Sequence, residues 1–514
     1  MTITAPTTSS AGHHCPADKR KYVLIVAILA SGMGFLDGSV VSIAIPQIRA
    51  SLDASFAQVQ WVHNSYILFL SALMLLGGAA GDRYGMKRVF SFGIVCFVVA
   101  SGLCAFAWSP LSLIMFRAVQ GAGAAIMIPG SMALISINTP RAERGKALGI
   151  WISASSITAA LGPVLGGLIL TYGGSEAWRW IFAINLPLGL IALALLSTQV
   201  PADQPRERKP LDFIGAFFLT AALALLAVGL TWLGERESTR LAFGLIVLSL
   251  FVGAGAVLFE LRVRDPMIEM RLFRSKVFAG VNALTLLVWS GLGGMFFFLP
   301  MLLIVGWKLP ATYAGGVFLP FTIVIAVLSP IAGRMSDRLG PRFMLTLGPV
   351  VCAVAFLLMG YAIAKQDFWT LLLPSMFLVG VGIALSASPL SNAVMNSVSD
   401  EYAGSASGIN NMLARLSNLV AIAGMGAVVS LVYRLIVTGS DLSPELQELM
   451  VSAGFGERLT GALYQVGTQS VQEIGMTHAM VVLCLMSALL ALLGALLGWL
   501  TQSVQAASDA ETGQ

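Results

Sequence analysis

Apolar runs of about twenty residues recur about fourteen times along this chain of 514 residues. An α-helix needs about twenty such residues to cross a bilayer. The composition agrees, because 57% of the residues are hydrophobic and only 11% are charged, against about a quarter in soluble domains. The mean hydropathy of +0.85 points the same way. We therefore expect an all-α integral membrane protein with 14 transmembrane helices.

Basic residues gather in alternate connections between these runs, and such connections usually lie in the cytoplasm. An even number of spans returns the chain to its starting side. The sequence therefore predicts a multi-pass protein of the cytoplasmic (inner) membrane with both termini in the cytoplasm. The basic clusters are Lys19, Arg20 and Lys21; Arg83, Lys87 and Arg88; Arg141, Arg144 and Lys146; Arg206, Arg208 and Lys209; Arg262, Arg264, Arg271, Arg274 and Lys276; and Arg334, Arg338 and Arg342.

An internal repeat relates the two halves of the sequence. The segment 78–87 recurs as 333–342, an offset of 333 − 78 = 255, and a weaker glycine pattern recurs at 404 − 145 = 259, which also relates Gly121 to Gly380. Spans 1 to 6 thus match spans 9 to 14, and spans 7 and 8 are an insertion. Six-helix repeats of this kind build transporters whose site lies at the repeat interface.

The repeat gives a division of the chain. We expect a cytoplasmic N-terminal tail over 1–21 and an N-terminal six-helix bundle over 22–198. A linker and the two inserted helices follow over 199–276. A C-terminal six-helix bundle covers 277–501 and contains an external loop over 434–478, and 502–514 forms a cytoplasmic tail.

Asp37 is a lone carboxylate within the first apolar run, 22–46. An ionised Asp at the bilayer centre costs at least about 2.5 to 3.5 kcal/mol, so such a residue usually faces a bundle interior or a wet cavity on an ion or substrate path. Asp37 is therefore the first functional candidate. The alternative is a structural hydrogen bond to a neighbouring helix.

Four motifs resemble those of the major facilitator superfamily, and of its fourteen-helix drug:proton antiporter family in particular. Residues 78–88 resemble the loop motif between helices 2 and 3, 113–123 resemble the helix-4 motif with its buried arginine, 162–167 resemble the helix-5 antiporter motif, and 36–46 resemble the acidic helix-1 motif. One position departs from the pattern, since the antiporter motif usually has glycine where this chain has Thr158. The resemblance implies two six-helix bundles plus two inserted helices, export, proton coupling and drug-like substrates.

Arg117 lies about as deep in its span as Asp37 does, roughly 9 to 14 Å from the outer helix ends at about 1.5 Å per residue. We expect the two to pair, directly or through water. The arginine favours an ionised Asp37 and desolvation favours a protonated one, so together they can poise a proton site. A purely structural Arg117 stays open. Candidates for the substrate cavity are Asn64, Tyr66, Gln120, Asn411 and Arg415, with bracing of the bundle as the alternative for Arg415.

Two groups of residues are candidates for conformational control. Around the tight turns, Asp82 and its repeat Asp337 can hold a facing helix end or a basic side chain and so act as a latch; the alternative is a plain topology signal. In span 5, small residues and a proline predict a bent helix that packs closely on its neighbours. The candidates are Gly78, Asp82, Arg83, Gly85, Asp337 and Arg338 for the latch, and Gly162, Pro163, Gly166 and Gly167 for the gate.

The sequence contains no nucleophile with a base in reach, no phosphate-binding glycine loop and no metal-ligand spacing, so we expect neither an enzyme nor a metal site. No cofactor is expected, and the proton gradient is the expected energy source. The hypothesis is a proton-coupled antiporter that exports drug-like amphipathic cations by alternating access. An exporter of one specific metabolite or antibiotic and a passive facilitator stay open.

The expected partners are a small-molecule substrate, protons and the lipid bilayer, without nucleic acid. We expect a functional monomer and leave a periplasmic adaptor open. The cation preference depends on Asp37 acting as a lone negative charge in the cavity.

Overall fold

A computed structural model describes residues 16, 18–201, 211–234, 239–399, 402–457, 459 and 466–512. Fourteen helices of these residues are long and apolar enough to cross a membrane, which confirms the predicted fold class. The helices are α1 Arg20–Leu52, α2 Phe56–Tyr84, α3 Met86–Ala105, α4 Pro110–Asn138, α5 Arg141–Tyr172, α6 Trp178–Ala183, α7 Asn185–Gln199, α8 Phe213–Leu233, α9 Thr239–Glu260, α10 Lys276–Met301, α11 Ala311–Gly316, α12 Leu319–Leu339, α13 Pro341–Lys365, α14 Leu373–Asn396, α15 Ala403–Thr438, α16 Pro444–Ala453 and α17 Val466–Thr512.

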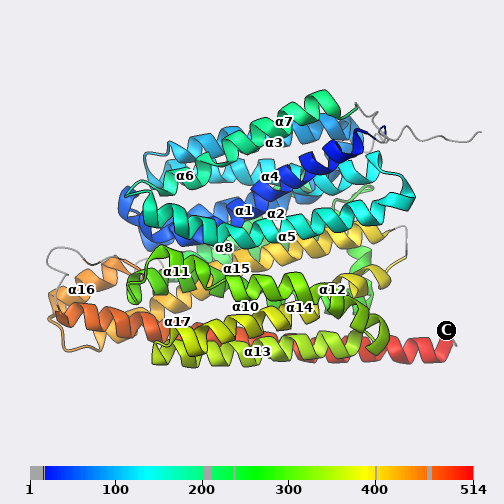
Figure 1. Cartoon of the computed structure of the whole chain (residues 1–514). Coiled ribbons are helices and arrows are strands. Elements are labelled where there is room, and N and C mark those ends of the chain that lie inside the picture. Colours follow the sequence, from blue (N-terminus) through cyan, green and yellow to red (C-terminus); the bar gives the residue numbers. More distant parts are fainter. Residues whose placement is uncertain are drawn as a thin grey trace, which may run out of the picture.

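The helices form two groups that lie side by side, with α1–α7 in one half and α10–α17 in the other (Figure 1). The start of α1 and the end of α17 lie at the same end of the molecule, which we call the terminal end. The short helix α16 lies at the opposite end, which we call the hairpin end (Figure 1). Helix α8 packs against α9, α2 and α15, so the inserted pair touches both halves.

Local sequence explains where α4 begins. Ser109 caps α4 in a box in which its hydroxyl accepts from the Ser112 amide and the Ser112 hydroxyl accepts from the Ser109 amide. Pro110 at the first helical position needs no hydrogen bond there. This pair separates α3 from α4.

The same close helix crossings occur in both halves. A Cβ atom on Gly121 of α4 would clash with the Tyr66 carbonyl oxygen of α2, and one on Gly380 of α14 would lie 2.8 Å from the Phe321 oxygen of α12. Tyr66 and Phe321 differ by the same offset of 255 as the repeated loops. The repeat in sequence is therefore a repeat in backbone contact.

A second crossing repeats as well. A Cβ atom on Gly123 would lie 2.7 Å from the Phe97 nitrogen, and one on Gly382 would lie 2.8 Å from the Cys352 nitrogen. Phe97 in α3 and Cys352 in α13 again differ by 255. Both halves thus place their fourth helix against the second and third through glycines at matching positions.

The structure corrects the boundaries near the C-terminus. The predicted loop 434–478 is too long, because α15 continues to Thr438 and α17 begins at Val466. The polar residues that suggested a loop find partners at the helix ends: Arg434 donates to the Gly234 oxygen at 2.6 Å, and Gln472 to the Glu457 oxygen at 2.5 Å. Helix α17 also continues through most of the predicted tail, to Thr512.

Within that connection, local sequence explains where α16 begins. The Ser443 hydroxyl accepts from the Leu446 amide at 3.4 Å, and Pro444 occupies the first helical position. Gly454, with φ of +76°, ends the helix.

Candidate functional site

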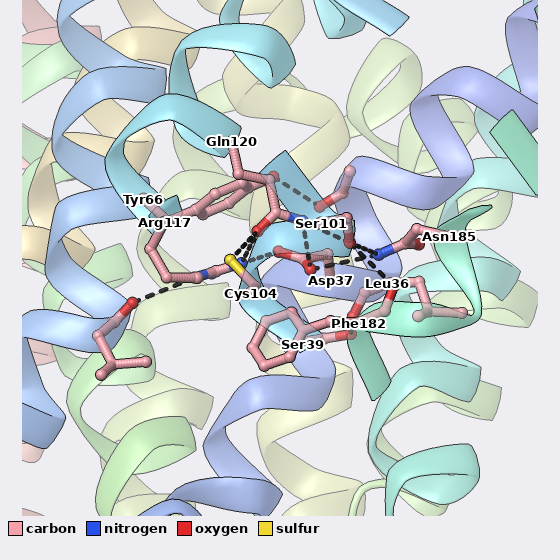
Figure 2. A network of polar contacts seen from close by, with 12 residues as sticks. Leu36, Asp37, Ser39, Tyr66, Ser101, Cys104, Arg117, Gln120, Phe182 and Asn185 are labelled. Atoms are coloured by element: carbon pink, nitrogen blue, oxygen red, sulfur yellow. Dashed lines mark hydrogen bonds and ion pairs between the residues drawn. The ribbon is translucent and has the colours of Figure 1, made fainter. Parts of the chain in front are cut away.

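A buried ion pair joins α1 to α4. Asp37 and Arg117 are both 0% exposed, and Nη1 of Arg117 bonds Oδ2 of Asp37 (Figure 2). Nε2 of Gln120 donates to the other carboxylate oxygen at 2.9 Å, and Oε1 of Gln120 accepts from Nη1 of Arg117 at 2.8 Å. Arg117 and Gln120 are three residues apart on one helix face, so one turn of α4 holds the whole carboxylate.

Helices α3 and α7 complete this network. Nδ2 of Asn185 lies 3.4 Å from Oδ1 of Asp37 and 3.0 Å from the Ser101 hydroxyl, which also accepts from Gln120 at 3.2 Å (Figure 2). The Ser101 hydroxyl donates to the Phe182 oxygen at 2.9 Å. Sequence reasoning missed Ser101, because serine is common in transmembrane helices and its spacing carries no distinctive signal.

Tyr66 of α2 packs against the ion pair. The Arg117 guanidinium lies 4.2 Å from the centre of the Tyr66 ring, and the Tyr66 hydroxyl donates to the Gly34 oxygen at 3.0 Å. Nε of Arg117 donates to the Val62 oxygen at 3.2 Å, whereas its Nη2 is buried without a partner. Any change in the charge of Asp37 therefore acts on α2 through Arg117.

A central cavity of about 540 Å³ lies between the two halves. Its N-terminal wall comes mainly from α1 and α2, whose lining residues are spaced three and four apart, as on one face of a helix. The opposite wall is strongly aromatic. The lining includes Phe35, Gly38, Ser39, His63, Tyr66, Pro163, Trp289, Phe296, Phe297, Phe318, Phe321, Arg415 and Asn418.

Of the five cavity candidates, Tyr66 and Arg415 line the cavity. Gln120 is 0% exposed within the Asp37 network, and Asn64 is 0% exposed with both amide atoms unpartnered. Asn411 is exposed and donates to the Ser407 oxygen at 3.0 Å. A polar residue within an apolar span can occupy any face of its helix. Polarity alone therefore could not show which of the five candidates line the cavity.

Asp37 does not line the cavity either, and it is paired with Arg117. The expectation of a cationic substrate depended on this carboxylate facing the cavity, so it loses that support. His63 and Asn418, which do line it, were missed. His63 precedes Tyr66 by three residues, and Asn418 follows Arg415 by three, so helical spacing from the named candidates would have found both.

The small residues of α5 serve two faces. Gly162 and Gly166 pack against α1. A Cβ atom on Gly162 would clash with the Ser39 hydroxyl, and one on Gly166 would lie 2.6 Å from the Val40 side chain. On the other face, a Cβ atom on Gly167 would lie 2.5 Å from the Ala311 oxygen of α11, and one on Gly315 would clash with the Pro163 oxygen. Helix α5 thus contacts its own half and the opposite half through different glycines.

The predicted latch turns lie at the terminal end. Gly85 and Gly340 have φ of +95° and +81°, a region that favours glycine, and they begin α3 and α13 at matching repeat positions. Asp82 and Arg83 both interact with neighbours, and Arg338 is exposed. A Cβ atom on Gly78 would meet nothing within 4 Å. The side chain of Asp337 lies outside the described residues.

A second ion pair of α1 bridges the halves at the hairpin end. Nε of Arg49 lies 2.6 Å from Oε2 of Glu457, and Nη1 donates to the Phe455 oxygen at 2.7 Å. Arg49 is 4% exposed. Nearby, the hydroxyls of Thr171 and Thr312 lie 2.7 Å apart. These contacts join the two halves at the hairpin end.

Among the described residues, no group of three or more His, Cys, Asp or Glu side chains could hold a metal ion. The arrangement offers instead a buried titratable group beside a cavity that two repeated halves share.

Comparison with known proteins gives a consistent result. A family model described as the Major Facilitator Superfamily matches residues 27–422. The multidrug resistance protein B homolog of Mycobacterium tuberculosis is 31% identical over 381 residues, 73% of this chain and 69% of that protein. The puromycin resistance protein of Streptomyces alboniger is 32% identical over 432 residues, 83% and 85% of the two chains.

Solved structures share the fold. A bacterial homolog of the human lysosomal transporter Spinster, inward-facing and unoccupied, matches with a TM-score of 0.68 at 16% identity, covering 95% of this chain and 99% of that one. A D-xylose–proton symporter matches with a TM-score of 0.61 at 16% identity, covering 93% and 97%.

Proposed function

This chain belongs to the major facilitator superfamily, and from that premise we propose that it is a proton-coupled antiporter that exports drug-like amphipathic compounds by alternating access. The observation that carries the proposal is the buried carboxylate of Asp37, held by Arg117 and separated by Tyr66 from a cavity between the two halves. Export of such compounds is suggested by the relatives, whose names include multidrug resistance and puromycin resistance.

In this proposal Asp37 carries the exchanged proton. A proton on Asp37 removes the negative charge that Nη1 of Arg117 meets, and the guanidinium then depends on Gln120, the Val62 oxygen and the Tyr66 ring. Because Tyr66 also lines the cavity, the protonation state of Asp37 changes the wall that the substrate touches. Release of the proton on the other side of the membrane restores the pair.

The position of the pair decides how this coupling reaches the substrate. Asp37, Arg117, Gln120 and Asn185 all belong to one half, so the network moves with that half as a unit. The cavity, in contrast, has walls from both halves. Protonation therefore acts on one wall of a site whose other wall moves during alternating access.

With the basic connections in the cytoplasm, the terminal end is the inner end and the hairpin end is the outer one. The contacts between the halves at the hairpin end then lie on the outer side, which supports an inward-facing state. In intact cells, an impermeant thiol reagent should label Glu448→Cys, which is exposed on α16, but not Arg264→Cys. The unsubstituted protein gives the background from the natural cysteines. The reverse pattern would overturn the orientation.

The function itself is tested in proteoliposomes that hold a pH gradient and a pH-sensitive dye. Adding a panel of aromatic dyes and antibiotics of either charge should dissipate the gradient faster than in protein-free liposomes. Transport without proton movement would indicate a facilitator. A response to one compound alone would indicate a dedicated exporter.

A further inference from the structure

Among the described residues that line the central cavity, Arg415 is the one of permanent charge, and none is Asp or Glu. Within the described part of the chain, the Arg415 guanidinium makes no hydrogen bond or ion pair, and it lies 5.4 Å from the Phe35 ring of the other half. Arg415 is half-buried, and a ligand of opposite charge would stabilise a charge that is partly removed from water.

The nearby ionisable residues do not neutralise Arg415. Asp37 is already bonded to Arg117 and Gln120, and that pair sums to zero charge. Arg117 lies behind Tyr66, outside the cavity wall. The cavity therefore carries a net positive charge from Arg415.

Two further polar side chains, Asn418 and His63, line the same cavity. Arg415 and Asn418 lie on one face of α15, and Gly293 of α10 leaves room for Asn418, since a Cβ atom there would clash with its amide oxygen. Opposite them, Nδ1 of His63 is buried without a partner, and the ring lies 5.4 Å from that of Phe297. A guanidinium presents five donors in a planar fork that matches a carboxylate.

Aromatic rings form the rest of the wall. The ring of Phe296 packs edge to face against Phe318 and Phe321, with centres 4.7 and 4.8 Å apart, and Trp289 lies on the same side. The hydroxyls of Ser39 and Ser42 donate to carbonyls of their own helix. The wall thus combines flat apolar surface with one cationic fork.

We propose that the cavity binds planar aromatic compounds that carry an anionic group, with Arg415 as the counter-ion and Asn418 and His63 as neighbouring polar contacts. This inference names the substrate class of the proposed exporter and rests on that function for the claim that the bound compound is exported. It replaces the expectation of cations, which depended on Asp37.

The test uses two dyes with the same xanthene ring, fluorescein as the anion and rhodamine 123 as the cation. Binding to the purified full-length protein in detergent is followed by fluorescence polarisation at neutral pH. The wild type should bind fluorescein more tightly than rhodamine 123 by about tenfold or more, as expected when a charged hydrogen bond is gained. Equal affinities, or tighter binding of rhodamine 123, would overturn the proposal without any variant.

Variants of the protein test whether Arg415 is responsible for the preference for fluorescein. Arg415→Gln should weaken fluorescein binding by about tenfold or more and leave rhodamine 123 no weaker. Arg415→Lys, which keeps the charge but not the fork, should retain part of the affinity. Arg264→Gln removes an exposed arginine outside the cavity and should change nothing. Unchanged fluorescein affinity in Arg415→Gln would contradict the assignment.

This assay needs no gradient, so it separates the two proposals. Selective binding that depends on Arg415, together with no proton movement in proteoliposomes, would support the anion site and remove the antiport. Proton movement driven by rhodamine 123 but not by fluorescein would support the antiport and contradict the anion site.

Discussion

The two halves of the molecule share their helix crossings but not their polar interiors. At the offset of 259 that relates Gly121 to Gly380, Arg117 corresponds to Met376 and Gln120 to Val379. Met376 and Val379 are 1% and 0% exposed. Helix α10, which corresponds to α1, carries no acidic residue. The backbone contacts are thus duplicated, whereas the ion pair belongs to the first half alone.

This difference suggests a division of labour. Glycines such as Gly123 and Gly382 fix the same packing in both halves, which a symmetric rocking motion requires. The first half buries the titratable group. The second half brings its charge, Arg415, into the cavity itself. The proposed proton site and the proposed anion site thus lie in different halves and are separated by the cavity wall.

The largest effect on stability should come from removing one partner of the Asp37–Arg117 ion pair. Arg117→Met copies the residue of the second half but leaves Asp37 buried and unpaired, which we expect to cost about 3 to 5 kcal/mol. Met376→Leu, at the corresponding position, should cost less than about 1.5 kcal/mol. Unfolding of the purified protein in detergent measures both. Equal costs would mean that the two interiors are energetically alike.

The double variant Asp37→Asn with Arg117→Met sharpens this test. Removing both charges should recover much of the loss seen with Arg117→Met alone, because no unpaired charge is then left buried. Simple addition of the two single losses would show that the pair does not act as a unit.

The shared crossings should respond alike. Gly121→Ala and Gly380→Ala each place a methyl group against a backbone oxygen, and we expect each to lose about 1 to 3 kcal/mol of stability, with Gly121 at the upper end. Gly149→Ala is the matched control, because a Cβ atom there meets nothing within 4 Å. The melting temperature in detergent reports all three. A loss at only one of the two crossings would argue against the structural repeat.

The smallest effect concerns the ion pair that bridges the halves. Burial raises the pKa of Glu457, although Arg49 opposes the shift. A raised pKa means that the folded state holds the proton more tightly, so this contribution to stability is present below the usual glutamate value of about 4.3 and is lost as pH rises through the folded value. Glu457→Gln should therefore flatten the slope of melting temperature against pH in this range. Glu448→Gln, an exposed neighbour on α16, should leave the slope unchanged.

Much of the fold was predictable, because bilayer thickness fixes span length and the turn glycines mark the repeat. The helix starts at Ser109 and Ser443 depend on local hydrogen bonding alone. The equal depth of Asp37 and Arg117 also led to a pair that the structure contains. Each of these features depends on the position of a residue along its own helix and not on the rotation of that helix.

Features that depend on the rotation of a helix were not predictable. Asn64 and Asn411 are polar residues in apolar spans, but neither faces the cavity, whereas His63, one residue before Asn64, does. The positive character of the cavity depends on Asp37 and Arg415 facing different environments. The loop 434–478 was overestimated because residues such as Gln472 pair with neighbours instead of with water.

The most direct test of the account compares two transport modes in the same proteoliposomes. Asp37→Asn keeps the size of the side chain but cannot titrate, so it should abolish transport driven by a pH gradient while exchange of labelled for unlabelled substrate without a gradient continues. Asp37→Glu should keep part of the driven transport, because the longer acid still titrates. Full gradient-driven transport by Asp37→Asn for every substrate tested would contradict the account and leave Asp37 a packing residue.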